Sequence, residues 1–179
     1  SPARLKQGLE KWGQIFYQFF GQSEAPMVLT NLARKEHDLA VPERLSSCGR
    51  PAPWVHLALL DDNNEEVAAG DAGEICVRSP LVMKGYKDLP EQTAEAFAGG
   101  WLHTGDIGRF DDEGFLYIVD RKKDMIVTGG FNVFPREVED VLSSHEAVAQ
   151  VAVVGVPDER WGEAVKAVIV LKPGVSGDD

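Results

Sequence analysis

Short apolar runs recur along this chain, and turn-forming residues bound each of them. Three runs, residues 13–20, 54–60 and 73–78, are rich in aromatic and β-branched side chains, which favour strands over helices. The acidic and asparagine residues at 61–66 lie between the last two runs and favour a turn. Residues 1–11 form a short amphipathic or irregular lead-in. Because no run approaches the ~20 apolar residues of a membrane-spanning helix, we expect a β-rich globular fold.

The middle of the chain continues this pattern with one helix and one hairpin. Residues 90–97 begin with Pro and Glu and end before two glycines, so they predict a short surface helix. Residues 107–110 and 115–119 flank a short acidic turn that ends in glycine, which predicts an antiparallel hairpin. Residues 31–49 show no sustained period, so no element is expected there.

The character of the sequence changes after Asp120. A charged segment, residues 121–124, precedes two short apolar runs and a predicted helix over residues 135–143 that begins with proline. The helix is expected to bury a stripe of three apolar residues: Val138, Val141 and Leu142. The β-branched runs at 148–156 and 164–171 supply the sheet that this stripe covers. The order β, β, α, β, β predicts a second unit of the α+β class.

Charge and cysteine content exclude several classes of protein. The chain has 18 Lys and Arg residues against 29 Asp and Glu residues, a formal net charge of −11, so its surface repels nucleic-acid phosphates. The spacing of the two cysteines, Cys48 and Cys76, indicates neither a disulfide framework nor a structural zinc site. This cysteine usage favours a cytoplasmic location. His103 has no partner at the spacing of a general base, so we expect it to be a loop residue.

The segment Phe20-Gly21-Gln22-Ser23-Glu24 is the first with side chains suited to a nucleotide. The ring of Phe20 suits stacking on a nucleobase, and Gly21 lets backbone amides approach an anion closely. The hydroxyl of Ser23 can donate to a phosphate oxygen, and the carboxylate of Glu24 can bind a hard cation that bridges phosphates. The same segment also fits a polar turn after a buried strand, so alone it does not separate the two interpretations.

Two later segments add groups suited to a ribose. Asp106 follows Gly105 and offers two acceptor oxygens for adjacent 2′ and 3′ hydroxyls, whereas an aspartate at the entry to a strand needs no ligand. Arg121 offers a planar fork of donors, and Gly129 and Gly130 remove side chains where an extended ligand could pass. Without a ligand, this last segment is a solvated charge run followed by a glycine turn.

Taken in order, these segments resemble the adenylate-forming enzyme superfamily, specifically its acyl-CoA synthetases. Their residue patterns are similar to the family's aromatic-Gly-x-Thr-Glu motif, its Thr-Gly-Asp motif and its Asp-Arg-Lys-Lys-Asp-Met-Ile hinge segment. Residues 73–86 and 155–163 resemble two further family signatures, and the resemblance covers residues 13–173. The chain departs from the family at Ser23, where threonine is usual, and at Phe20, where tyrosine is common. Both changes are mild, because they keep the hydroxyl and the aromatic face.

The resemblance implies a role for each candidate residue. Four residues of the first part and one of the hinge segment would hold the nucleotide and its metal: Phe20 on adenine, Ser23 on phosphate, Glu24 on Mg²⁺, and Asp106 with Arg121 on the ribose. Lys123 would be the hinge residue between domains. Gly129 and Gly130 would line the passage for pantetheine. Glu24 and Lys123 are therefore the candidate catalytic residues, and Phe20, Gly21, Ser23, Asp106, Arg121, Gly129 and Gly130 the candidate cofactor-binding residues.

The resemblance also implies a fold and a reaction. Residues 1–120 would be the end of a large adenylating domain with a β-rich, barrel-like subdomain, residues 121–124 the hinge, and residues 125–179 an incomplete small α+β domain. The fold class is thus α/β to α+β. The family reaction uses ATP, Mg²⁺ and coenzyme A to convert a carboxylic acid, here a fatty or aryl acid, into an acyl-adenylate and then a thioester. The family's Gly-rich phosphate loop and its C-terminal catalytic lysine are absent from this sequence, so the isolated chain is expected to be inactive.

Two alternatives remain open from the sequence. One is an adenylating enzyme that transfers its acyl group to a carrier-protein thiol instead of coenzyme A. The sequence of residues 131–135 resembles that of CoA ligases more than that of adenylation domains linked to carrier proteins. The other is a non-catalytic, acidic, β-rich binding module that has kept the shape and lost the chemistry. The acyl substrate and the oligomeric state are not determined by these residues.

Overall fold

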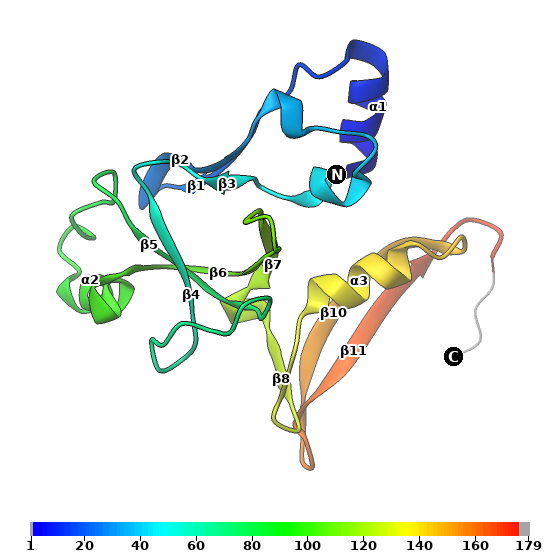
Figure 1. Ribbon diagram of the computed structural model, residues 1–179. Coiled ribbons are helices and arrows are strands. Elements are labelled where there is room, and N and C mark those ends of the chain that lie inside the picture. Colours follow the sequence, from blue (N-terminus) through cyan, green and yellow to red (C-terminus); the bar gives the residue numbers. More distant parts are fainter. Residues whose placement is uncertain (1, 176–179) are drawn as a thin grey trace. The chain divides into compact units, whose positions relative to one another are not determined.

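A computed structural model describes residues 2–175 (Figure 1). The chain separates into two compact units, the first ending at Ile118 and the second beginning at Val119. This division lies close to the predicted boundary at residue 120, and the assignment of residues 121–124 as a hinge remains a prediction. Each unit is described below by itself.

The first unit contains two helices and two small sheets. One sheet has the order β1-β2-β3 and the other the order β4-β5-β6-β7. The pairs β1·β2, β2·β3, β4·β5 and β5·β6 are all antiparallel. The elements are α1 (Pro2–Trp12), β1 (Gln18–Gln22), β2 (Ala25–Leu32), β3 (Arg50–Pro51), β4 (His56–Leu60), β5 (Gly73–Arg78), α2 (Pro90–Ala96), β6 (Leu102–Phe110) and β7 (Leu116–Arg121), with short 3-10 turns at Arg34–Glu36, Pro42–Ser46 and Ala98–Gly100.

The core of the first unit is centred on β5, which lies between β4 and β6. Ile75, Cys76 and Val77 are consecutive and almost completely buried, so both faces of this strand are covered. The apolar side chains of Ile75, Cys76 and Val77 suit these positions, whereas Glu74 on the same strand is a charged residue that is also buried. Burying each such aliphatic side chain contributes about 1.5–3 kcal/mol. Leu29, Leu102 and other side chains of both sheets belong to the same cluster.

The second unit is one antiparallel sheet with a helix packed on it. Its elements are a 3-10 turn (Lys122–Asp124), β8 (Ile126–Thr128), β9 (Phe131–Val133), α3 (Pro135–Ser143), β10 (Val148–Asp158) and β11 (Gly162–Leu171). The strand order is β10-β11-β8-β9, and α3 packs against β10. The element order β, β, α, β, β matches the α+β prediction. Val138 and Leu142 are half-buried as expected, whereas Val141 is 71 % exposed and does not belong to the buried stripe.

Several elements differ from the sequence predictions. Residues 1–11 contain a regular helix, α1, and β2 was not predicted at all. The strand predicted from residue 13 begins only at Gln18. The mixed, strand-rich class is confirmed, but the described residues form open sheets rather than a closed barrel. Among residues 2–175, no helix has the length and apolarity needed to cross a membrane.

Candidate functional site

The first candidate segment forms the turn between β1 and β2. β1 ends at Gln22 and β2 begins at Ala25, so Ser23 and Glu24 occupy the turn. The phenol of Tyr86 donates a hydrogen bond to Oε1 of Glu24 at 3.1 Å, and the Met83 N–H donates to the Glu24 carbonyl at 2.7 Å. Two contacts from one downstream loop therefore fix both the backbone and the carboxylate of Glu24.

Phe20 lies in the hydrophobic core rather than on the surface. It is 8 % exposed and belongs to the main buried cluster. Because side chains alternate along a strand, its neighbour Phe19 points to the opposite face, is 57 % exposed, and stacks on Tyr17 with ring centroids 6.0 Å apart. Within the first unit, the ring of Phe19 is therefore more accessible to solvent than the ring of Phe20. Stacking of Phe20 on adenine remains a prediction.

A side-chain hydrogen bond joins the first candidate segment to the second. Gln22 donates from Nε2 to the carbonyl oxygen of Thr104 at 3.3 Å, across 82 residues of sequence. Thr104 is followed directly by Gly105 and Asp106, the residues expected to meet a ribose. The structure therefore brings the β1–β2 turn and the Thr104–Asp106 segment together within the first unit.

Asp106 lies on β6 and is half-buried. Its N–H donates to the Thr104 hydroxyl at 3.2 Å, and the same hydroxyl donates to the Ile75 carbonyl at 2.7 Å. The carboxylate acts electrostatically on Cys48. Burial is the main cause that raises the pKa of the Cys48 thiol, and the negative charge of Asp106 raises it further. The thiol is consequently kept in its uncharged form beside this site.

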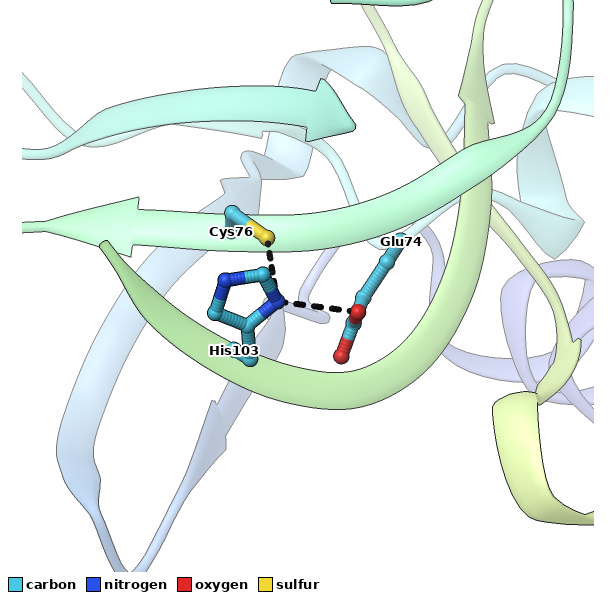
Figure 2. Close-up of side chains that lie close together, drawn as sticks. All are labelled: Glu74, Cys76 and His103. Carbon is cyan, nitrogen blue, oxygen red and sulfur yellow. Dashed lines mark hydrogen bonds and ion pairs between the residues drawn. The ribbon is translucent and has the colours of Figure 1, made fainter. Parts of the chain in front are cut away.

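His103 is not a loop residue, and the prediction was wrong on this point. It lies on β6 with Nδ1 2.9 Å from Oε2 of Glu74 and 3.4 Å from Sγ of Cys76 (Figure 2). Its Nε2 lies 3.2 Å from the Ala98 carbonyl oxygen. Glu74 is almost completely buried, and its second carboxylate oxygen accepts a hydrogen bond from the Gly105 N–H at 3.0 Å. No spacing rule reveals this group, because its members come from two paired strands 27 to 29 residues apart.

The second unit holds the remaining candidates. Arg121 ends β7, and Lys123 lies in the following 3-10 turn, exposed to solvent. The carboxylate of Asp120 accepts hydrogen bonds from the Arg121 N–H at 2.8 Å and from the Arg136 N–H at 2.9 Å. Arg136 is the second residue of α3, so Asp120 ties the charged segment to the helix N-terminus. Lys123 also lines a polar pocket of about 570 Å³ together with Asp124, Arg136, Glu139 and Glu163.

Gly129 and Gly130 form the tight connection of the β8–β9 hairpin. Their φ angles are 57° and 83°, and Thr128 pairs directly with Phe131. A two-residue loop with both φ angles positive matches the hairpin turn that favours glycine at both positions. A Cβ on Gly129 would lie 2.7 Å from the Trp161 ring, whereas a Cβ on Gly130 would meet nothing within 4 Å. The turn therefore accounts for both glycines, and the passage for pantetheine remains a prediction.

Comparisons with known proteins agree with these two units. The family described as "AMP-binding enzyme" matches residues 1–87, and the "AMP-binding enzyme C-terminal domain" matches residues 137–179. The chain is 58 % identical over its whole length to the medium/long-chain-fatty-acid–CoA ligase FadD8 of Mycobacterium tuberculosis and covers 31 % of that protein. The chain thus spans about a third of the length of this relative.

Two solved structures are similar over nearly the whole chain. The amide bond synthetase McbA of Marinactinospora thermotolerans has a TM-score of 0.84 at 41 % identity, with 99 % of this chain and 36 % of that chain covered. The o-succinylbenzoate CoA synthetase of Bacillus subtilis, in complex with ATP and magnesium ion, has a TM-score of 0.80 at 36 % identity, with 98 % of this chain and 36 % of that chain covered. The chain therefore belongs to the AMP-binding, adenylate-forming enzyme family and is similar to a C-terminal part of its acyl-CoA synthetases.

Proposed function

We propose that the protein containing this chain is an ATP-dependent acyl-CoA ligase, in which the chain supplies adenosine-binding, Mg²⁺-binding and hinge residues. The observation that carries the proposal is the hydrogen bond from Gln22 to Thr104. It joins the turn that bears Ser23 and Glu24 to the segment that bears Asp106. The Ser23 hydroxyl, the Glu24 carboxylate and the Asp106 carboxylate are groups suited to a phosphate, a cation and a ribose, respectively.

Glu24 is suited to hold Mg²⁺. Its carboxylate is half-exposed on a turn, and the Tyr86 phenol orients it from one side. Burial raises the pKa of Tyr86, and the bond to Glu24 raises it further, so the phenol stays protonated and remains a donor at neutral pH. When bound, Mg²⁺ neutralises charge on the phosphates of ATP. A donor that fixes Glu24 preorganises one ligand of that ion.

In the proposed first step, an oxygen of the substrate carboxylate attacks the α-phosphorus of ATP. The new bond forms an acyl-adenylate, and the bond to pyrophosphate breaks. Asp106 would accept hydrogen bonds from the ribose hydroxyls, with Arg121 donating to ribose oxygens, and so hold the α-phosphorus in line with the carboxylate. Positioning of this kind is a large part of catalysis in phosphoryl and nucleotidyl transfer.

In the proposed second step, the sulfur of coenzyme A attacks the acyl carbon, and AMP leaves. The second unit would rotate about Lys123 to bring Gly129 and Gly130 to the acyl carbonyl. The exposed position of Lys123 in a 3-10 turn of three residues is compatible with a hinge, because few packed side chains would oppose a change in its backbone angles.

The acyl substrate that we propose is a medium- or long-chain fatty acid. The support is the 58 % identity to a medium/long-chain-fatty-acid–CoA ligase, over the full length of the chain. The similarity to an amide bond synthetase shows that this fold also occurs with a different acceptor. The acceptor must therefore be identified by experiment.

Product analysis of the full-length protein tests this proposal. The protein is incubated with ATP, Mg²⁺ and a fatty acid of about 8–18 carbons, with coenzyme A, a carrier-protein thiol or an amine as acceptor. We expect AMP, pyrophosphate and an acyl-CoA thioester, with little product from the other two acceptors. Acyl-adenylate formation without CoA transfer would support the carrier-protein alternative, and no AMP with any acid would support the non-catalytic module.

A further inference from the structure

The Thr104–Asp106 segment leaves the regular ladder between β5 and β6. Cys76 pairs with His103 and Glu74 pairs with Ile107, so Ile75 alone faces three residues of β6. The segment is therefore an enlarged β-bulge, with Gly105 at its centre in the left-handed region, φ 73°. Bulges re-aim side chains and are frequent beside active sites. This one determines where the carboxylate of Asp106 points.

Side chains replace the ladder hydrogen bonds that the bulge interrupts. Oε1 of Glu74 accepts from the Gly105 N–H at 3.0 Å. The Thr104 hydroxyl donates to the Ile75 carbonyl at 2.7 Å and accepts from the Asp106 N–H at 3.2 Å. Because leaving a buried backbone group without a partner is costly, these bonds specify the shape of the bulge.

Glu74 is itself held from the opposite side. Its Oε2 lies 2.9 Å from Nδ1 of His103 (Figure 2). The Nε2 of the same ring lies 3.2 Å from the Ala98 carbonyl oxygen. Glu74 is 5 % exposed, so its carboxylate has little freedom to turn away. A chain of contacts thus runs from Ala98 through His103 and Glu74 to the backbone of Gly105.

We infer that Glu74, oriented by His103, is a positioning residue that holds the bulge so that Asp106 meets the ribose hydroxyls of ATP. This inference rests on the proposed function, because it requires that Asp106 binds the ribose. It adds two residues to the nucleotide site, neither of which would touch the substrate. Cys76 completes the buried surroundings of the His103 ring at 3.4 Å.

A bound metal ion is the competing interpretation of the same atoms. Ligand atoms of Glu74, Cys76 and His103 lie within 4.8 Å of one another, which is a spacing that a metal ion requires. The geometry favours the positioning role, because both carboxylate oxygens of Glu74 already contact polar groups of the protein and one of them contacts the bulge. Metal content is therefore part of the test.

The experiment compares Glu74→Gln, His103→Gln and Asp106→Asn in the full-length protein, with Glu65→Gln as a control at an exposed position of the β4–β5 loop. The kinetic parameters are measured with ATP, 2′-deoxy-ATP and 3′-deoxy-ATP. We expect Glu74→Gln to raise the KM for ATP about tenfold, a change of the size expected for a charge-assisted hydrogen bond, and to reduce the preference for ATP over the deoxy analogues. His103→Gln should act in the same direction with a smaller effect, and Glu65→Gln should match the wild type.

Double variants separate the positioning role from general loss of folding. In the Asp106→Asn background, Glu74→Gln should change the KM for ATP by less than about threefold, because both substitutions remove the same interaction. A destabilised but correctly shaped protein would lose active fraction, and hence kcat, while keeping its preference for ATP over the deoxy analogues. That pattern would overturn the inference.

Three further outcomes are distinct. If Asp106→Asn leaves the KM for ATP and the deoxy preference unchanged, the proposed ribose contact fails. If Asp106→Asn has the expected effect and Glu74→Gln has none, only the positioning role fails. One equivalent of a transition metal in the purified wild type, lost in Cys76→Ser and His103→Gln, would replace the positioning role by a metal site.

Discussion

The phenol of Tyr86 donates a hydrogen bond to Oε1 of Glu24, 3.1 Å away and 62 residues earlier in the sequence. This bond links a loop after β5 to the β1–β2 turn. Tyr86 thereby orients the carboxylate that we propose as the Mg²⁺ ligand.

Removing the hydroxyl of Tyr86 tests whether this hydrogen bond orients Glu24 for Mg²⁺. We expect Tyr86→Phe to raise the Mg²⁺ concentration needed for half-maximal activity of the full-length protein about threefold to tenfold, since one hydrogen bond to a charged group is lost. The unfolding midpoint should change little, because Tyr86 lies at the surface, 37 % exposed, and its ring is retained. Tyr17→Phe is the matched control, because Tyr17 is also exposed and its ring keeps its stacking on Phe19. An unchanged Mg²⁺ dependence in Tyr86→Phe would contradict the claim that the Tyr86 phenol orients Glu24.

Tyr117 should ionise at unusually high pH. Burial is the main cause that raises the pKa of Tyr117 to about 12 from its ordinary value of 10.0, and the hydrogen bond to Asp111 adds to it. The uncharged phenol is favoured in the folded state, so its stabilising contribution is complete below pH 10 and is lost as the pH rises toward 12. Phenolate absorbance should show a titration near pH 12 that Tyr117→Phe removes. A normal midpoint for all three tyrosines would refute this expectation.

The two glycines of the β8–β9 turn should differ in their tolerance of a side chain. Both alanine variants force a positive φ, at a cost of about 1–2 kcal/mol. Gly129→Ala adds a contact of 2.7 Å with the Trp161 ring, whereas Gly130→Ala meets open space. Urea unfolding should therefore show the larger loss of stability for Gly129→Ala.

The same pair separates a structural turn from a passage for pantetheine. If the passage is present, Gly130→Ala should fold and form the acyl-adenylate at a normal rate but transfer the acyl group to CoA slowly. Normal rates for both steps in a folded Gly130→Ala protein would leave these glycines with a structural role alone.

Elements defined by local chemistry were predicted closely. The helix α3 begins at Pro135, because proline fits the first helical turn, and β5 spans residues 73–78 as its β-branched residues Ile75 and Val77 indicate. β2 was missed, because Pro26 and Asn31 interrupt its pattern and its stability comes from pairing with β1 and the short β3. Stability that comes from pairing with neighbouring strands leaves little trace in the residues of the strand itself.

In the candidate site, too, individual residues could be predicted from the sequence but the contacts between distant segments could not. Ser23, Glu24 and Asp106 could be selected because each lies in a short segment whose side chains already suit a nucleotide. The contacts of Gln22 with Thr104 and of Glu74 with His103 could not be predicted, because each spans at least 29 residues and depends on strand register. The exposed position of Val141 on α3 likewise could not be predicted from the sequence.

The most direct test of the central claim is the KM for ATP of Asp106→Asn in the full-length protein, with Asp112→Asn as a control at an exposed position of the β6–β7 turn. The nucleotide site that we propose predicts a KM for ATP raised about tenfold or more, because a charge-assisted contact with the ribose is lost, and a KM for the fatty acid within about twofold of the wild type. Asp112→Asn should behave as the wild type. Equal KM values for ATP in the wild type and Asp106→Asn would contradict the claim that the β1–β2 turn and the Thr104–Asp106 segment form one nucleotide site.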